Sequence, residues 1–287
     1  MDLARLLPDR DSRLVRWGGN VLLVLALAYC GFAIARLGMD EVLANLPPAA
    51  WGIALGTGAA YGLALALLAL GWGAMAHGRG NAHLGVAEGL AVYAPGVIAK
   101  YIPGSVFQYG SRQLLGSRFG LSQGAMVRAS LVEAGLHVPA ALICAAVLLA
   151  GAGAAGLAAF IVLGAALAVL GPGSLARAAG CQLAFFALFA LFVALLAGIA
   201  LGMGVPLRLA GILMLAWVAG FLVPVAPGGL GVRESVLLAL SAQVEPSGAA
   251  IAAFALLTRF ATSLGDAGFG IAGYGLLFTR SKRQASS

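Results

Sequence analysis

The sequence predicts an all-α membrane protein, a polytopic bundle of transmembrane helices. Hydrophobic residues make up 62% of the 287 residues, charged residues only 9%, and the mean hydropathy is +1.01. Soluble domains carry about 25% charged residues, so this chain is too poor in charge for a soluble fold. Glycine is also abundant, with 42 residues, and small residues let transmembrane helices pack closely. No polar stretch is long enough for a separate soluble domain, so residues 1–287 are expected to form one integral membrane domain.

Apolar runs long enough to cross a hydrocarbon core of about 30 Å follow one another along the chain. Six are uninterrupted: 17–35, 51–76, 123–150, 154–171, 181–203 and 249–278. Two further segments, 85–118 and 208–242, are broken by Pro and Gly. The end of the first run, Ala33-Ile34-Ala35, also fits a signal-peptide cleavage site, and the topology of the later runs is the same on either interpretation.

The number of membrane crossings depends on the two broken segments. If they are re-entrant hairpins that do not cross, six full spans remain; if each crosses, there are eight. Both numbers are even, so both termini lie on one side. The basic N-terminus 1–16 and the basic tail 280–287 place that side in the cytoplasm by the positive-inside rule.

The six-span arrangement predicts two repeat units, residues 51–150 and residues 181–279. Each unit would contain a span, a broken hairpin and a second span, and the two units would have opposite orientations. An inverted repeat of this kind suits alternating access, and paired broken helices point to a transporter's binding site.

The second break, Pro224–Glu234, is the most informative segment of the chain. Gly228, Gly229 and Gly231 allow tight turns, and a helix is expected to start near Gly231 or Val232. The N–H groups of that helix start, together with the guanidinium of Arg233, would face an anion such as a lipid phosphate. Alternatively, the glycines serve helix packing and Glu234 complements the helix start.

The first break follows the same order. Pro103-Gly104-Ser105 can start a half-helix, and Arg112 follows about two turns later. Arg112 is therefore a second candidate for binding an anion. The alternative is an ordinary cytoplasmic loop, in which Lys100 and Arg118 act as topology determinants.

Two of the uninterrupted runs carry polar residues on one helix face. These are Ser130, Glu133 and His137 in one run, and Arg259, Thr262, Ser263 and Asp266 in the other. Charges inside a bilayer are costly and usually functional, so the two stripes are expected to face each other across a polar cavity. Arg259 could pair there with Glu133 or Asp266, and Arg259 would also bind substrate. The alternatives are structural ion pairs and, for His137, a packing role instead of proton relay.

Other site chemistries lack their sequence patterns. Cys30, Cys144 and Cys181 all lie in apolar runs and are expected to be small packing residues. There is no metal-ligand spacing, no phosphate-binding loop of an ATP-driven motor and no nucleophile elbow. The net charge of +7 comes mostly from loops and termini, which does not favour nucleic-acid binding. We therefore expect no cofactor, no metal and no enzymatic activity; the alternative is an integral membrane enzyme that acts on a lipid phosphate through Glu133 and His137.

Several of these segments together resemble the family of lysylphosphatidylglycerol synthase transmembrane regions, also called flippase-like integral membrane proteins. The segments are Lys100–Gly104, Arg112, Glu133, Pro227–Glu234 and Leu256–Arg259. The Gly-Gly-Leu-Gly-Val-Arg-Glu stretch is the most specific of them. The resemblance covers nearly the whole chain from the second run onward and implies lipid translocation. The aminoacyl-transferase domain of the bifunctional members is not present in this sequence, so lipid synthesis is not expected.

The sequence thus predicts a translocase in the bacterial inner membrane for a lipid with an anionic head group, of phospholipid or polyprenyl-phosphate type. Arg112, Arg233 and Arg259 would bind the head group, and Glu133, His137, Glu234 and Asp266 would provide charge pairing or proton coupling. The rival hypothesis is a non-transporting scaffold or regulatory subunit of an envelope glycosyltransferase or lipid-modifying enzyme. Small-residue faces such as Gly52-x-x-x-Gly56 could also serve a homo-oligomer.

Overall fold

The computed structural model describes residues 46–76, 84–101, 106–202, 204, 206–224, 226–242 and 248–285. Within these residues the fold is all-α and contains no strand, as predicted. The helices, in chain order, are α3 (Pro48–Ala76), α4 (Val86–Ala99), α5 (Val106–Ser117), α6 (Gln123–Leu149), α7 (Gly153–Leu170), α8 (Gly173–Ala200), α9 (Leu207–Phe221), the 3₁₀ turn η2 (Pro227–Gly229), α10 (Val232–Leu240) and α11 (Gly248–Ala285).

Five of the described helices, α3, α6, α7, α8 and α11, are long and apolar enough to cross a membrane. They coincide with five of the six predicted uninterrupted runs, and the sixth, 17–35, lies outside the described residues together with the N-terminus 1–16. The largest difference in bounds is at α8, which begins at Gly173 instead of 181. Residues 173–180 are mostly small and continue the helix beyond its most apolar part.

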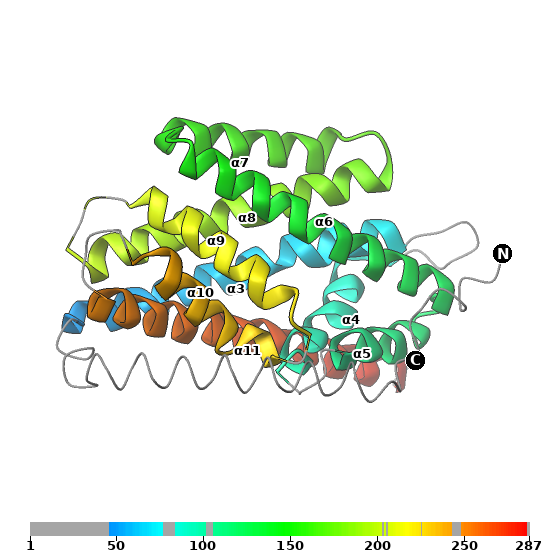
Figure 1. Ribbon diagram of the computed structural model, residues 1–287. Coiled ribbons are helices and arrows are strands. Elements are labelled where there is room, and N and C mark those ends of the chain that lie inside the picture. The colour runs from blue at the N-terminus through cyan, green and yellow to red at the C-terminus, as the bar shows by residue number, and fades with distance from the viewer. Residues whose placement is uncertain are drawn as a thin grey trace, which may run out of the picture.

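Helices α3 and α8 pack against each other in the bundle, α7 lies at one edge against α8, and α11 lies at the opposite edge against α3 and α4 (Figure 1). Helices α3 and α11 approach so closely that a Cβ added to Gly58 would lie 2.7 Å from the carbonyl oxygen of Ala261. A Cβ added to Gly62 would lie 2.9 Å from the carbonyl oxygen of Gly265. Small residues therefore set this helix crossing. Gly52 and Gly56, the pattern singled out in the sequence, have nothing within reach of an added Cβ.

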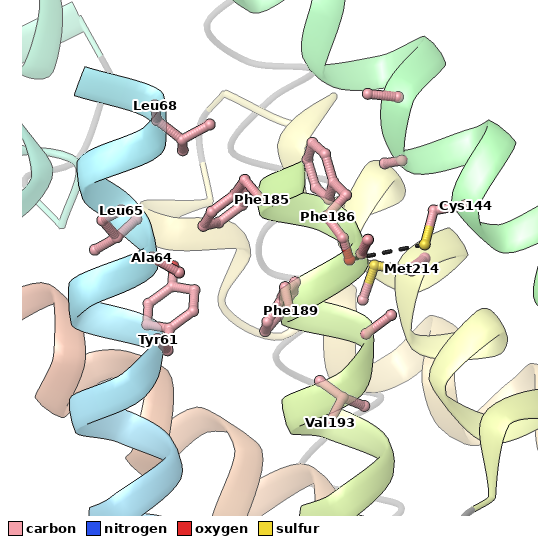
Figure 2. Packing of buried hydrophobic residues seen from close by; sticks show 14 of the residues in the cluster. Tyr61, Ala64, Leu65, Leu68, Cys144, Phe185, Phe186, Phe189, Val193 and Met214 are labelled. Atoms are coloured by element: carbon pink, nitrogen blue, oxygen red, sulfur yellow. Dashed lines mark hydrogen bonds between the residues drawn. The ribbon is translucent and has the colours of Figure 1, made fainter. Parts of the chain in front are cut away.

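Aromatic side chains of α8 connect the helices on both of its sides (Figure 2). Phe185 and Phe189 point toward α3, where their rings lie 5.9 and 5.3 Å from the ring of Tyr61. Phe186 lies on the opposite side, toward α6 and α9. Cys144 and Cys181 are buried free thiols, as expected for packing residues, whereas Cys30 lies outside the described residues.

Each broken segment folds as a pair of short helices. Helix α4 packs against α5 and lies along α11, whereas α9 packs against α10 and lies along α6. Pro95 lies inside α4, as Pro can within a protein-covered membrane helix. The break at 102–105 lies outside the described residues. The two short-helix pairs bring polar side chains to the centre of an otherwise apolar bundle.

Candidate functional site

A cavity of about 360 Å³ occupies the centre of the described bundle. Its wall includes residues from α3, α4, α5, α6, α8, α9, α10 and α11 and from the segment between α9 and α10. Eight of the ten predicted site residues line it: Arg112, Glu133, His137, Gly228, Gly229, Arg233, Arg259 and Asp266. Thr262 lines the cavity as well, so the predicted polar stripes of α6 and α11 do meet at one cavity.

The part of the cavity wall where α5 faces α6 contains a buried ion pair. The Nη1 atom of Arg112 lies 2.5 Å from Oε2 of Glu133, and both residues are only 3% exposed. The hydroxyl of Tyr93 donates to the other carboxylate oxygen of Glu133. The guanidinium of Arg112 lies 3.7 Å from the centre of the Tyr93 ring. Arg112 is therefore held by a carboxylate and an aromatic face, although its Nε has no partner.

Glycine conformation shapes the second break. Gly228, Gly229 and Gly231 have φ values of 57°, 71° and 79°, in the left-handed region that glycine adopts without steric cost. Gly231 precedes α10, and its N–H donates to Oε2 of Glu234 at 2.8 Å. The helix start predicted near Gly231 or Val232 is confirmed. Gly231 and Glu234 cap this helix next to the cavity and are not part of its wall.

Two arginines converge on the second carboxylate oxygen of Glu234. Nε of Arg259 lies 3.3 Å and Nε of Arg233 3.9 Å from Oε1 of Glu234. Nη1 of Arg259 also donates to the carbonyl oxygen of Gly228 at 2.7 Å. The Nη2 atoms of Arg233 and Arg259 are buried and have no hydrogen-bond partner. This cluster therefore contains two cations, one anion and unused donors at the cavity wall.

Arg259 does not form the ion pair that the sequence suggested. Glu133 and Asp266 were the expected partners, but the structure pairs Glu133 with Arg112 and Asp266 with Lys100. The carboxylate that reaches Arg259 comes from Glu234, 25 residues earlier in the chain. The broader expectation that Glu133 and Glu234 pair with the site arginines agrees with these contacts, whereas the specific partner expected for Arg259 was wrong.

Asp266 forms a third polar cluster where α11 meets the end of α4. Its Oδ2 lies 2.8 Å from Nζ of Lys100 and accepts a hydrogen bond from the Tyr101 hydroxyl at 2.6 Å. Its Oδ1 accepts from the Tyr61 hydroxyl at 3.3 Å. Tyr101 lies in the turn after α4, outside the long apolar helices, and burial followed by the Asp266 charge raises the pKa of its hydroxyl. Tyr101 therefore stays a hydrogen-bond donor near neutral pH.

The three tyrosines and Lys100 are the site residues that sequence reasoning missed. Tyr61, Tyr93 and Tyr101 each donate to a cavity carboxylate. The sequence did not mark these tyrosines as site residues because tyrosine is common in apolar helices. The only available signal for Tyr101 was its position beside Lys100 just before the Pro-Gly break.

His137 lies among aromatic rings at the wall formed by α6 and α9. Its Nδ1–H donates to the carbonyl oxygen of Glu133 at 3.0 Å. Its ring stacks on Phe221 with a centroid distance of 5.4 Å, and Phe186 and Trp217 lie at 5.7 Å. This setting fits a neutral imidazole that packs against α9. Among the described residues, no group of three His, Cys, Asp or Glu side chains could hold a metal ion.

Several residues of the cavity wall remain partly exposed, and some of them belong to the first short-helix pair and to the end of α9. Lys100, Tyr109, Phe221 and Val223 are wall residues that remain partly exposed. Ala134, near the middle of α6, is also partly exposed. If α6 crosses the membrane, Ala134 lies near the central part of that span, at the depth of the lipid chains.

No protein-family model matches the chain, and neither a curated protein nor a solved structure matches it. The resemblance to flippase-like integral membrane proteins therefore stays a prediction that rests on the motifs quoted above.

Proposed function

We propose that this protein is a lipid translocase of the bacterial inner membrane that moves a lipid with an anionic head group. The family resemblance supports this proposal, as do five helices long and apolar enough to cross a membrane. In the proposed mechanism the head group enters the central cavity while the lipid chains stay in the surrounding bilayer.

The observation that carries the proposal is the unused donor capacity of Arg233. This side chain lines the cavity, the residue is 6% exposed, and its Nη2 has no partner. A buried guanidinium with unused N–H donors is costly unless a polar group or anion is bound there at some stage. A phosphate offers acceptor oxygens in the geometry that a guanidinium fork matches.

The contacts between helices support an inverted repeat. The units predicted as 51–150 and 181–279 correspond to α3, α4–α5, α6 and to α8, α9–α10, α11. Helices α4 and α9 each lie along the last helix of the other unit, and α5 and α10 each contact the last helix of their own unit. If the short-helix pairs do not cross, α6 and α7 intervene between α3 and α8, so the two units run in opposite directions. Together with the predicted run 17–35, this arrangement would give six spans, an even number that places both termini on one side.

The partly exposed residues of the cavity wall support movement of a lipid. They include polar residues, such as Lys100, and apolar residues, such as Phe221 and Val223. A head group could sit inside near Arg233 while a chain extends outward past these residues. No separate path for an entire lipid is required.

The proposal is tested by lipid translocation in proteoliposomes, with fluorescent phosphatidylglycerol and a fluorescent polyprenyl phosphate assayed in parallel. The wild type should move at least one lipid, and Arg233→Gln should reduce that rate by about tenfold or more, the equivalent of about 1.4 kcal/mol. Arg128→Gln, an exposed substitution on α6, is the matched control and should retain the wild-type rate.

Each other outcome speaks against the proposal. If folded wild-type protein moves neither lipid, the scaffold hypothesis replaces it, and co-purification of a partner enzyme becomes the next measurement. If Arg233→Gln is folded and transports normally, the anion site is not at the second break.

A further inference from the structure

The charges around the cavity do not balance. The cations are Lys100, Arg112, Arg233 and Arg259, and the carboxylates are Glu133, Asp266 and Glu234, the last of which contacts the wall from behind Arg259. The described part of the cavity therefore has one more cation than carboxylates, with His137 counted as neutral because its ring is buried among three aromatic rings.

The surplus charge can be located. Arg112 pairs with Glu133, and Lys100 pairs with Asp266, so these two clusters are neutral. The remaining cluster contains Arg233, Arg259 and Glu234. Its single carboxylate already accepts from the backbone of Gly231 through one oxygen and faces both arginines with the other. One positive charge is left over at this cluster.

Two of the three unused arginine donors lie at the same cluster, where Oε1 of Glu234 also lacks a hydrogen-bond partner, and the third is Nε of Arg112. Nη2 of Arg233 and Nη2 of Arg259 are both buried and unpartnered, and both residues line the cavity. The excess charge and the free N–H groups are independent observations that coincide at one place. An anion bound there would satisfy both.

We propose that the anion held by Arg233 and Arg259 carries one negative charge, as a phosphodiester does, and that the cavity discriminates against phosphomonoesters and diphosphates. This inference rests on the proposed function and narrows its substrate class. It separates two possibilities that the sequence left open, because a glycerophospholipid such as phosphatidylglycerol is a phosphodiester, whereas a polyprenyl phosphate is a phosphomonoester.

The physical reason is the cost of an uncompensated charge away from water. A phosphodiester would neutralise the surplus and leave the cavity without net charge. A phosphomonoester carries about −1.5 to −2 at neutral pH and would leave the cavity with an excess of negative charge. A low-dielectric site amplifies such an imbalance of charge. The preference for a phosphodiester over a phosphomonoester should therefore depend on the single carboxylate of the cluster, which belongs to Glu234.

The experiment changes the charge of the cluster without changing its shape. Glu234→Gln removes one negative charge and keeps a side chain that can still cap α10. Glu88→Gln is the matched control, because Glu88 accepts from the N–H of Gly85 at the start of α4 in the same way, at 2.6 Å, and does not line the cavity. Each variant is purified at full length and assayed with fluorescent phosphatidylglycerol and fluorescent phosphatidic acid at pH 8.

We expect the wild type and Glu88→Gln to move phosphatidylglycerol about tenfold faster than phosphatidic acid, corresponding to about 1.4 kcal/mol of selectivity. Glu234→Gln, with a cluster charge higher by one, should lose or reverse that preference. Equal rates for both lipids in the wild type would overturn the inference. So would a preference that Glu234→Gln leaves unchanged.

A binding measurement separates this inference from the proposed function. Thermal stabilisation of the protein is measured with glycerophosphoglycerol, glycerol 3-phosphate and pyrophosphate, which are water-soluble and need no transport. Stronger stabilisation by the diester would support the single-charge site even if no lipid moves. Stabilisation by none of the three would overturn the site, and transport without charge preference would overturn only the single-charge inference.

Discussion

The two broken segments of this protein contain similar sequence elements and end in different chemical states. In the first, Arg112 is enclosed by Glu133 and the ring of Tyr93. In the second, Arg233 shares the carboxylate of Glu234 with Arg259 from α11, and both arginines keep unused donors. A Pro-Gly break followed by an arginine can therefore lead either to a closed, buried ion pair or to arginines with donors left for an anion. Which one forms depends on how many carboxylates the neighbouring helices supply.

The largest expected effect on stability comes from breaking the buried ion pair between Arg112 and Glu133. Arg112→Met leaves the Glu133 carboxylate buried without its cation, and breaking a buried ion pair typically costs about 3–5 kcal/mol. We expect a marked loss of thermal stability in detergent, measured by fluorescence-detected size-exclusion chromatography after heating. Arg233→Gln, which removes a surplus charge, should unfold near the wild-type temperature.

A double variant sharpens the comparison. Arg112→Met combined with Glu133→Leu removes both charges, and replacing a whole buried pair by apolar residues is often neutral. The double variant should therefore recover most of the stability that Arg112→Met loses. If it stays as unstable as the single variant, Arg112 contributes by packing against Tyr93 and Trp72, not by its charge.

The sequence was sufficient for the long helices, because hydrophobicity is a local signal. Helix α6 was predicted to end at residue 150 and ends at Leu149, and the predicted start of α10 was within one residue. The bounds were less accurate at α8, where small residues extend a helix without raising its hydropathy. The fold class and the helices follow from composition and periodicity along the chain.

The pairing of charges could not be predicted in the same way. Spacing placed Glu133 and Asp266 on inward faces, and both do line the cavity. Their partners Arg112 and Lys100 come from a different helix pair, and sequence distance carries no information about such contacts. The close approach of α3 and α11 through Gly58 and Gly62 was also missed, since a chain with 42 glycines offers many equivalent small-residue patterns.

A smaller effect is expected at the place where the two broken segments meet. A Cβ added to Gly228 would lie 3.1 Å from Cε1 of Tyr101, and its φ of 57° disfavours any other L-residue. Gly228→Ala should therefore cost about 2 kcal/mol from backbone strain and crowding, read as a lower thermal midpoint. Gly204→Ala, where an added Cβ has nothing within 4 Å, is the control. Equal thermal midpoints for both variants would mean that Gly228 is neither strained nor in close contact with Tyr101.

The smallest expected effect concerns how the end of α4 is attached to α11. Tyr101→Phe removes one hydrogen bond to Asp266, which keeps Lys100 and Tyr61 as partners, so we expect a cost of about 1 kcal/mol. The effect of Tyr101→Phe on transport also tests whether the first broken segment contributes to movement but not to anion binding. If both segments move during transport, loosening the first at Tyr101 should change the rate while leaving the stabilisation by glycerophosphoglycerol at Arg233 unchanged. A loss of that stabilisation would instead show that Asp266 and Tyr101 belong to the anion site. The neutral cluster of Lys100 and Asp266 would then not be separate from the charged cluster of Arg233, Arg259 and Glu234.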